Sequence, residues 1–320
     1  MFIMVPPDND APQGMHTLYA DRSEAYRVEY VNDEIYDTRD GIPLHIQLIY
    51  PCSVPPRLME KRLPDNGSAL ASAFANVKPS VTWPLVVFVE GSAWMKQDCY
   101  RALPMFTDVA RRGYVVASVE YRPSDVAGWP AFLLDVKAAI RYLRANAELY
   151  SIDKERVAIW GCSSGGNASL LTGVTGWTRE FDDGLCPDES SAVKAAISYF
   201  GVTDVPKMFG RPRDELSTMM VPSPEDILFR TSVIDHPEAA APGNPLNYVS
   251  EDKPCPPVLL IHGDEDGTVP FNQSVLMYEK LVSCGKQADL YKVKGAGHGM
   301  YFWTKEVMDV TLRFLDAYLK

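Results

Sequence analysis

The sequence lacks long hydrophobic runs. No stretch approaches the roughly 20 uninterrupted apolar residues that a membrane-spanning helix requires, because charges or prolines interrupt every strand-like run. The apolar start of the chain ends at Val5, carries no Lys or Arg and leads directly into Pro6 and Pro7. That is not the pattern of a secretory signal peptide. We therefore expect a cytoplasmic protein with no membrane partner.

Paired cysteines and an excess of basic residues are also absent. The six cysteines form no CxxC pair and show no regular spacing, which argues against a zinc site and against a disulfide framework. The chain has 31 Lys and Arg residues against 42 Asp and Glu residues, a formal net charge of −11. Such a chain repels nucleic-acid phosphates and anionic lipid surfaces. We expect no nucleic-acid partner, and a small molecule or a neutral polymer fits better.

What is present is the composition of a globular protein, with 46% hydrophobic and 23% charged residues. Short β-rich runs alternate with longer helical patterns, which is typical of parallel strands joined by crossover helices. Most of the runs are nearly continuous apolar segments, as expected of strands buried on both faces. The predicted strands are Pro84–Glu90, Tyr114–Val119, Arg156–Trp160, Val193–Phe200, Pro257–His262 and Leu290–Lys294.

Two further patterns complete the predicted fold. Apolar residues at helical spacing mark the segments Ala131–Leu149, Asn272–Val282 and Trp303–Leu319. Before the first parallel strand, Tyr26–Tyr36 and His45–Tyr50 predict an antiparallel hairpin. The fold class is therefore α/β, with helices on both faces of the sheet.

We expect a single domain over residues 1–320, with two segments outside the alternation. Residues 52–83 are rich in Pro, Ser, Ala and Asn, and are interpreted as a surface insertion. Residues 201–253 contain several prolines and two short helical stretches, and are interpreted as a cap over the site. Loops of such length are usually functional or disordered. A homo-oligomer is compatible with the sequence.

The motif with chemical meaning is Gly161-Cys162-Ser163-Ser164-Gly165, which lies between a predicted strand and helix-like residues. In this context G-x-S-x-G places a serine on a tight turn, with its hydroxyl exposed at the helix N-terminus. Only Ser163 has glycine on both sides at this spacing, and the backbone N–H of Ser164 is placed to donate to an oxyanion. The other interpretation is a Gly-rich turn that binds phosphate, but the Lys of a P-loop is missing.

A serine nucleophile needs a base, usually a histidine that a carboxylate orients. Of the five histidines, His298 lies in the small-residue loop Gly295–Gly299 at the end of the last predicted strand, where a base would reach Ser163. His262 ends a buried strand and is either a core residue or a support for the next loop. The others are interpreted as structural or solvated: His16, His45 and His236.

The acid and the oxyanion donors are expected at other strand ends. The segment His262–Pro270 lies between serine and histidine in the chain, as the acid should. It offers three carboxylates, and the residues alone do not distinguish among them. The loop Gly91-Ser92-Ala93-Trp94 follows the strand Pro84–Glu90 and is the expected source of backbone N–H donors. Trp94 either stacks on a substrate ring or packs as a core aromatic.

These motifs resemble the α/β-hydrolase superfamily and, within it, the branch related to hormone-sensitive lipase that includes acetyl-xylan, feruloyl and other carbohydrate esterases. The resemblance covers about residue 44 to the C-terminus and implies a mostly parallel central sheet with flanking helices and a cap-like insertion. The matching stretches are Glu120-Tyr121-Arg122, Trp129-Pro130, Asp135–Ala139, Ile152-Asp153, Arg156–Gly161, Asn244-Pro245-Leu246, His262–Pro270 and Gly295–Gly299.

The resemblance also implies roles for individual residues. It selects Asp266 as the acid and so gives a triad of Ser163, Asp266 and His298. It implies an oxyanion hole made by the N–H groups of Ser92, Ala93 and Ser164, with Gly91 and Trp94 as candidate substrate contacts. No metal and no organic cofactor is implied.

One departure from the family stands out in the oxyanion loop. The family often begins this loop with His-Gly-Gly-Gly, whereas here Glu90 replaces the histidine and Ser92-Ala93 replace the later glycines. Backbone N–H groups remain available in the loop. Glu90 is interpreted either as a hydrogen-bonding support for the loop or as a carboxylate near the substrate.

We hypothesise a serine carboxylester hydrolase that acts through an acyl-enzyme. The resemblance favours a short acyl group such as acetyl, or an aromatic one such as feruloyl, on a sugar or oligosaccharide. An amide hydrolase of the same fold, like an arylformamidase or a peptidase, is the alternative. A non-catalytic, hydrolase-like binding protein is disfavoured because His298 is present.

Overall fold

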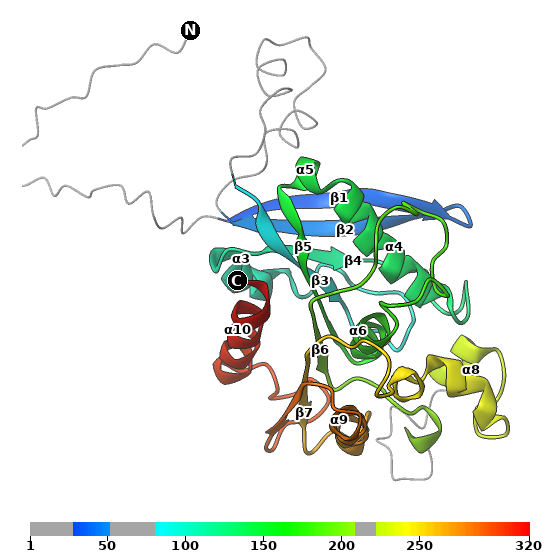
Figure 1. The fold of residues 1–320 in the computed structure, drawn as a ribbon. Helices are drawn as coiled ribbons and strands as arrows, with labels where there is room; N and C mark the ends of the chain where they lie inside the picture. Colours follow the sequence, from blue (N-terminus) through cyan, green and yellow to red (C-terminus); the bar gives the residue numbers. More distant parts are fainter. Residues whose placement is uncertain (1–27, 52–80, 209–221) are drawn as a thin grey trace, which may run out of the picture.

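The centre of the molecule is an eight-stranded sheet with the strand order β1-β2-β4-β3-β5-β6-β7-β8 (Figure 1). A computed structural model describes residues 28–51, 81–208 and 222–320. The strands are β1 (Val28–Arg39), β2 (Ile42–Pro51), β3 (Trp83–Val89), β4 (Val115–Val119), β5 (Ile152–Cys162), β6 (Ala195–Tyr199), β7 (Val258–Gly263) and β8 (Ala288–Val293).

The direction of the strands matches the expectation from the sequence. β1 and β2 form an antiparallel hairpin, and β2 pairs antiparallel with β4. Every neighbouring pair from β4 through β3 to β8 is parallel. The predicted hairpin and the predicted mostly parallel sheet are therefore confirmed. Parallel strands need crossover connections, which is why helices separate them in the chain.

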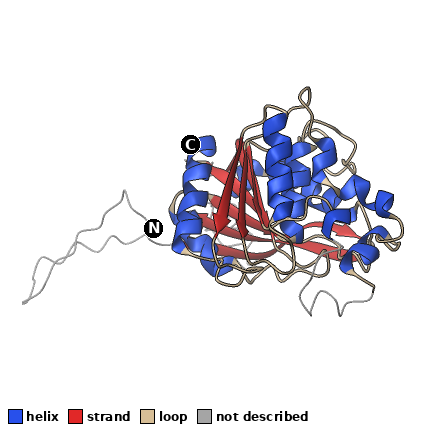
Figure 2. Ribbon diagram, turned by 90° about the horizontal axis from the view of Figure 1, so that it is seen from below, coloured by secondary structure: helices blue, strands red, loops and turns tan. Residues whose placement is uncertain are grey.

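Helices cover both faces of the sheet, as Figure 2 shows. Helices α4, α6 and α9 pack on one face, whereas α3 and α10 pack on the other. The α-helices are α3 (Leu103–Arg111), α4 (Ala131–Ala145), α5 (Ala147–Tyr150), α6 (Ser164–Val174), α8 (Pro224–Phe229), α9 (Asn272–Ser283) and α10 (Lys305–Leu319). The 3-10 helices are η1 (Pro206–Met208), η2 (Pro237–Gly243) and η3 (Pro245–Tyr248).

Two helix boundaries differ from the sequence prediction, and one helix is missing from it. The predicted helix Ala131–Leu149 is broken at Asn146, whose side-chain amide donates to the Tyr142 carbonyl and competes with helix continuation. α10 begins at Lys305 rather than at Trp303, because Thr304 accepts the Val307 N–H as an N-cap. α3 is not predicted from the sequence at all.

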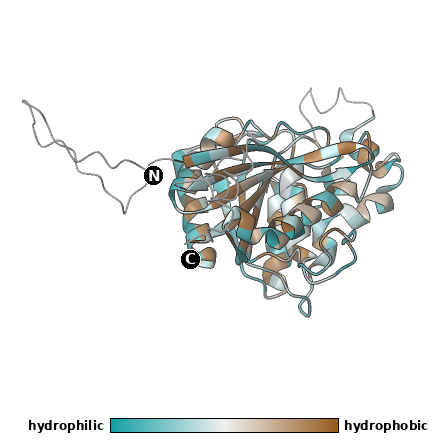
Figure 3. Ribbon diagram, turned by 90° about the horizontal axis from the view of Figure 1, so that it is seen from above, coloured by the Kyte–Doolittle hydropathy of each residue, from teal (hydrophilic) through white to brown (hydrophobic). Residues whose placement is uncertain are grey.

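The central strands are deeply buried. Every residue of β4, β6 and β7 is buried, and β3 is buried from its second residue onward. Figure 3 shows hydrophobic residues along the central strands, whereas the helices carry a mixture of hydrophobic and polar residues. Burial on both faces explains why the sequence shows continuous apolar runs there instead of alternation.

The two predicted insertions are described only in part. Residues 52–80 of the predicted surface insertion lie outside the described residues. Of residues 201–253, the described part contains η1, α8, η2 and η3. Asn167 in α6 donates from its side-chain amide to the carbonyls of Val202 and Gly243, at 2.9 and 3.1 Å. These bonds attach the segment beside the helix that begins at the G-x-S-x-G motif, and its role as a cap stays a prediction.

Within the part of the chain that the structure describes, no helix has the length and apolarity needed to cross a membrane.

Candidate active site

Ser163 occupies the sharp turn between β5 and α6. Its φ of 55° lies in the left-handed region, and its N–H donates to the Tyr199 carbonyl at 2.9 Å. The two flanking glycines allow this turn. A Cβ atom on Gly161 would lie 2.1 Å from the Gly165 carbonyl oxygen, and one on Gly165 would lie 2.0 Å from the Val89 carbonyl oxygen. The predicted strand–turn–helix context of the motif is therefore confirmed.

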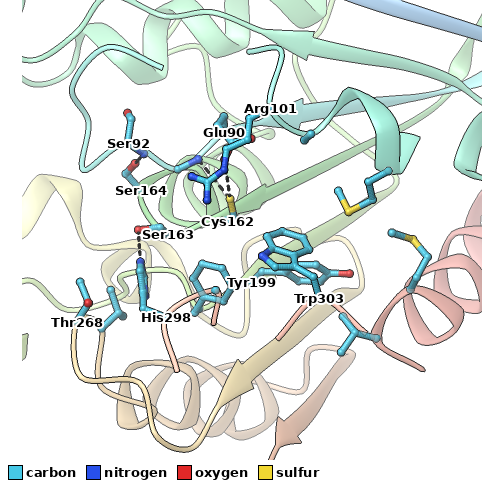
Figure 4. Close-up of a pocket in the computed structure, with 18 of the residues that line it drawn as sticks. Glu90, Ser92, Arg101, Cys162, Ser163, Ser164, Tyr199, Thr268, His298 and Trp303 are labelled. Carbon is cyan, nitrogen blue, oxygen red and sulfur yellow. Dashed lines mark hydrogen bonds between the residues drawn. The ribbon is translucent and has the colours of Figure 1, made fainter. Parts of the chain in front are cut away.

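The structure brings Ser163, His298 and Asp266 together from three different strand ends. His298 Nε2 lies 3.0 Å from Ser163 Oγ (Figure 4), and His298 Nδ1 lies 2.8 Å from Asp266 Oδ2. The other two carboxylates of the acidic segment face elsewhere. Asp264 accepts the Gly295 N–H, and Glu265 is exposed. Of the three, only Asp266 orients the imidazole.

Asp266 is held firmly in the position that it needs. Its Oδ1 accepts the backbone N–H groups of Thr268 and Val269, at 2.9 and 2.8 Å, and its side chain has no exposed surface. Burial raises the pKa of Asp266, but hydrogen bonds from His262 and His298 outweigh burial and lower this pKa to about 2. The acid is thus a carboxylate at neutral pH.

His262 supports the loop that carries Asp266, which is one of its two interpretations from the sequence. Its Nε2 lies 2.9 Å from the Val269 carbonyl oxygen and 3.3 Å from Asp266 Oδ2, and its Nδ1 lies 2.7 Å from Ser274 Oγ. The side chain is fully buried. The sequence signal for this role is the position of His262 at a strand end, four residues before the acid.

The predicted oxyanion donors do not all face the site. Ser92 N–H donates to Ser164 Oγ at 2.9 Å (Figure 4), which departs from the prediction that this N–H binds the oxyanion. The acceptor of this N–H is therefore a side-chain oxygen that lies 72 residues away in the sequence. The N–H groups of Ala93 and Ser164 make no hydrogen bond to the described residues. Ser164 opens α6, where first-turn N–H groups lack intrahelical partners.

Gly91 and Trp94, the predicted substrate contacts, have structural roles. A Cβ atom on Gly91 would lie 2.8 Å from both Cys162 O and Ser163 Cβ, so this position requires glycine. Trp94 is only 2% exposed, and its Nε1 donates to Asn167 Oδ1 at 3.4 Å. Both residues border the cavity described below. A Trp94 ring so deeply packed favours its interpretation as a core aromatic, and its contact with a substrate stays a prediction.

Glu90 and Cys162 line the cavity beside the nucleophile. The Cys162 thiol is directed toward Glu90 Oε1, at 3.7 Å, and accepts the Gly91 N–H at 3.3 Å. Burial raises the pKa of Glu90, with the Arg101 guanidinium opposing this effect. Burial also raises the pKa of the Cys162 thiol. Glu90 therefore contacts Cys162 of the elbow and also lines the cavity that Ser163 and His298 border, so both of its interpretations stay predictions. Cys162 is a buried, protonated thiol without a catalytic position.

A cavity of about 1,100 Å³ opens at Ser163 and His298. It runs between α3 and α10, where its apolar lining consists of Met105, Trp303, Val307, Met308 and Leu312. Pro224 and Glu225, from residues 201–253, also line it. In the described ranges no group of His, Cys, Asp and Glu side chains is arranged to hold a metal ion. The site offers an activated hydroxyl beside a roomy apolar cleft, which suits acyl transfer.

Comparisons with known proteins agree with this chemistry. The BD-FAE family model matches residues 74–281, well over half of the chain. Esterase LipC of Mycobacterium tuberculosis is 29% identical over 223 residues, which are 69% of this chain and 54% of LipC. The probable carboxylic ester hydrolase LipM of the same organism is 28% identical over 211 residues, which are 66% of this chain and 47% of LipM. The chain spans about half the length of these curated relatives.

Solved structures show the same fold. A truncated carbohydrate esterase from gut microbiota is 26% identical, with a TM-score of 0.71 over 91% of this chain and 96% of that one. A bifunctional GH43-CE protein of Bacteroides eggerthii is 27% identical, with a TM-score of 0.73 over 91% of this chain and 38% of that one. These structures confirm the predicted α/β-hydrolase fold and the resemblance to esterases.

Proposed function

The chain belongs to the BD-FAE family, and we propose that it is a serine carboxylester hydrolase. The observation that carries the proposal is the continuous hydrogen-bonded line from Ser163 Oγ through the two nitrogens of His298 to Asp266 Oδ2. Similarity to LipC and LipM, which are named as an esterase and a probable ester hydrolase, supports the same reaction class.

The proposed reaction follows from the geometry. Ser163 Oγ attacks the ester carbonyl carbon while His298 Nε2 takes the hydroxyl proton, and Asp266 stabilises the imidazolium that forms. The N–H groups of Ala93 and Ser164 bind the negative oxygen of the tetrahedral intermediate. The alkoxide then leaves with the proton from His298. Water, activated by the same imidazole, hydrolyses the acyl-enzyme and restores Ser163.

For the substrate, we propose a short-chain or aromatic acyl ester, such as acetyl or feruloyl, on a sugar or oligosaccharide. Two of the similar structures are described as carbohydrate esterases or as carrying such a module. The cavity volume of about 1,100 Å³ supports a substrate larger than a simple acetate ester. The expected partner is therefore a small-molecule or oligosaccharide ester.

The test is hydrolysis of an ester panel by the wild type and Ser163→Ala. The panel contains p-nitrophenyl esters from acetate to octanoate, acetylated xylo-oligosaccharides, methyl ferulate and an aryl formamide. We expect Ser163→Ala to lose at least about 10³-fold in kcat, because removal of the nucleophile leaves only binding and oxyanion stabilisation. Circular dichroism of both proteins controls for folding.

Two outcomes would contradict the proposal. Ester turnover that survives in Ser163→Ala would refute the assigned nucleophile. Cleavage of the aryl formamide alone would favour the amide-hydrolase alternative over a carboxylesterase.

A further inference from the structure

Two consecutive residues of the oxyanion loop adopt a backbone conformation that L-residues rarely take. The φ angles of Ala93 and Trp94 are 53° and 58°, and neither residue is a glycine. Such conformations cost free energy and persist only where surrounding contacts fix them. This loop therefore needs contacts that hold it in place, and those contacts identify further residues on which its geometry depends.

Ser164 supplies one of these contacts from the nucleophile elbow. Its hydroxyl oxygen accepts the Ser92 N–H at 2.9 Å (Figure 4). Ser164 is only 1% exposed and directly follows Ser163, so its position is fixed by α6. This hydrogen bond therefore joins the oxyanion loop directly to the nucleophile turn.

Tyr121 completes the network from the segment after β4. Its hydroxyl lies 3.0 Å from Ser92 Oγ and 3.5 Å from Ser164 Oγ. Ser92 Oγ donates its only proton to the Met95 carbonyl at 2.6 Å, so the Tyr121 hydroxyl is the donor to Ser92 Oγ. Burial raises the pKa of Tyr121 to about 12, which keeps this donor protonated at neutral pH.

We propose that the Ser164 hydroxyl, with the Tyr121 hydroxyl behind it, is a positioning group that holds the oxyanion loop. We call Ser92, Tyr121 and Ser164 the loop anchor. In this assignment the N–H groups of Ala93 and Ser164 bind the oxyanion, and the Ser92 N–H serves only to fix the loop. The inference rests on the proposed hydrolase function of the same site.

The anchor should affect the transition state more than the bound substrate. Without the Ser164 hydroxyl, the Ser92 N–H loses its partner and the loop can relax from its left-handed backbone conformation. The Ala93 N–H then moves away from where negative charge develops. Donors aimed at that charge contribute mainly to the transition state, so their displacement lowers kcat rather than raising KM.

The experiment compares Ser164→Ala with a matched control on the same helix. Ser169 is also buried in α6, but its hydroxyl bonds to the carbonyls of Ile159 and Ile197 and not to the loop. For Ser164→Ala we expect kcat on p-nitrophenyl acetate to fall about tenfold, the typical effect of one hydrogen bond, with KM changed by less than about twofold. Ser169→Ala should retain the wild-type kcat.

A second readout does not need turnover. Phenylboronic acid forms a tetrahedral adduct with a serine nucleophile, and the negative charge of that adduct requires the same donors. Calorimetric titration should show about tenfold weaker binding to Ser164→Ala than to the wild type. Tyr121→Phe, which removes only the supporting hydroxyl, should lose about threefold in both kcat and boronate affinity.

Wild-type kcat and wild-type boronate affinity in Ser164→Ala would overturn the anchor. An increase in kcat would also overturn it. Such an increase would mean that the Ser92 N–H binds the oxyanion once the Ser164 hydroxyl no longer accepts it. If Ser164→Ala does not fold, unchanged values in Tyr121→Phe would refute the proposal. Absence of Ser163-dependent ester hydrolysis in the wild type would refute the proposed function instead, whereas the boronate titration would still test the anchor.

Discussion

At Asp266, two histidines converge on one carboxylate. One oxygen is held by backbone N–H groups, and the other faces His298 and His262. Because an ionised carboxylate is only an acceptor, His298 Nδ1 must carry the proton, which leaves Nε2 free to accept from Ser163. The buried carboxylate thus selects the tautomer that the proposed role of His298 as a base requires.

The stability of the protein in acid should depend on Asp266. Its pKa is lowered from 3.8 to about 2 in the folded protein, so its contribution is fully present above about pH 4 and is lost as the pH falls toward 2. The shift corresponds to about 2 kcal/mol of unfolding free energy. The free energy of unfolding, measured with urea between pH 2 and 5, should therefore decline less steeply with falling pH for Asp266→Asn than for the wild type.

The control for that experiment is Asp264→Asn, an equally conservative change in the same loop but outside the triad. It leaves the contacts of Asp266 with His262 and His298 in place, so it separates their loss from a general effect of the substitution. Equal slopes for Asp266→Asn and the wild type would show that the two histidine contacts do not stabilise the fold in the way described.

Single residues of the site differ in how far the sequence predicts them. Ser163 follows from its glycine spacing, and His298 from its flexible loop at a strand end. Asp266 requires the family resemblance, because three acidic residues share one turn. The partner of the Ser92 N–H cannot be read from the sequence, since the bond joins residues 72 positions apart. The burial of Trp94 likewise depends on helices that local patterns do not place around it.

At the scale of elements, Asp135 attaches α4 to the sheet. Its fully buried carboxylate accepts Arg39 Nη1 at 2.8 Å, and the backbone N–H, Nε and Nη2 of Arg122 at 2.9 Å each. Arg39 belongs to β1, and Arg122 follows β4 by three residues. One carboxylate therefore links a helix, the hairpin and the segment that carries Tyr121 of the loop anchor.

Asp135→Asn should destabilise the protein by about 2–3 kcal/mol, because it removes a buried charge that accepts four hydrogen bonds, while Arg39 keeps Asp37 and Asp183 and Arg122 keeps Asp40 as partners. Guanidinium unfolding monitored by fluorescence measures this loss. The control is Asp153→Asn, which breaks the partly exposed pair with Arg156 and should cost at most about 1 kcal/mol. Similar losses in the two variants would contradict the structural importance of the buried pair.

The elements themselves are largely predictable, with instructive exceptions. Continuous apolar runs identify the central strands because both of their faces are buried. α3 escapes prediction because Ala102 precedes it as an N-cap without any side-chain capping bond, which leaves Pro104 in the first turn as a weak start signal by itself. Its position over β2 and β4 comes from tertiary packing, which a single-sequence pattern does not encode.

At the scale of the whole molecule, the sheet and its flanking helices leave a large cavity at the triad. Its volume of about 1,100 Å³ reaches the upper end of the range typical for ligand sites. Trp303 forms part of its wall and packs against Tyr199, with ring centroids 5.5 Å apart. An acetyl group alone would leave most of this apolar wall without a contact.

Trp303→Ala should therefore discriminate between large and small esters. We expect kcat/KM for methyl ferulate to fall about tenfold through lost apolar contact, while p-nitrophenyl acetate changes by less than about twofold. The control is Trp177→Ala, because Trp177 has the same exposed fraction of 43% but does not line the cavity. Equal effects on both esters would mean that this wall does not contact the substrate.

The placement of the triad on three strand ends also has a consequence for refolding. Ser163 and His298 are 135 positions apart in the chain, and β6 lies between the strands that carry Ser163 and Asp266. Contacts of such sequence separation form slowly compared with local helices. After dilution from denaturant, turnover should therefore return only when the C-terminal half of the sheet has assembled. Far-ultraviolet ellipticity should recover earlier, because it reports the formation of the helices.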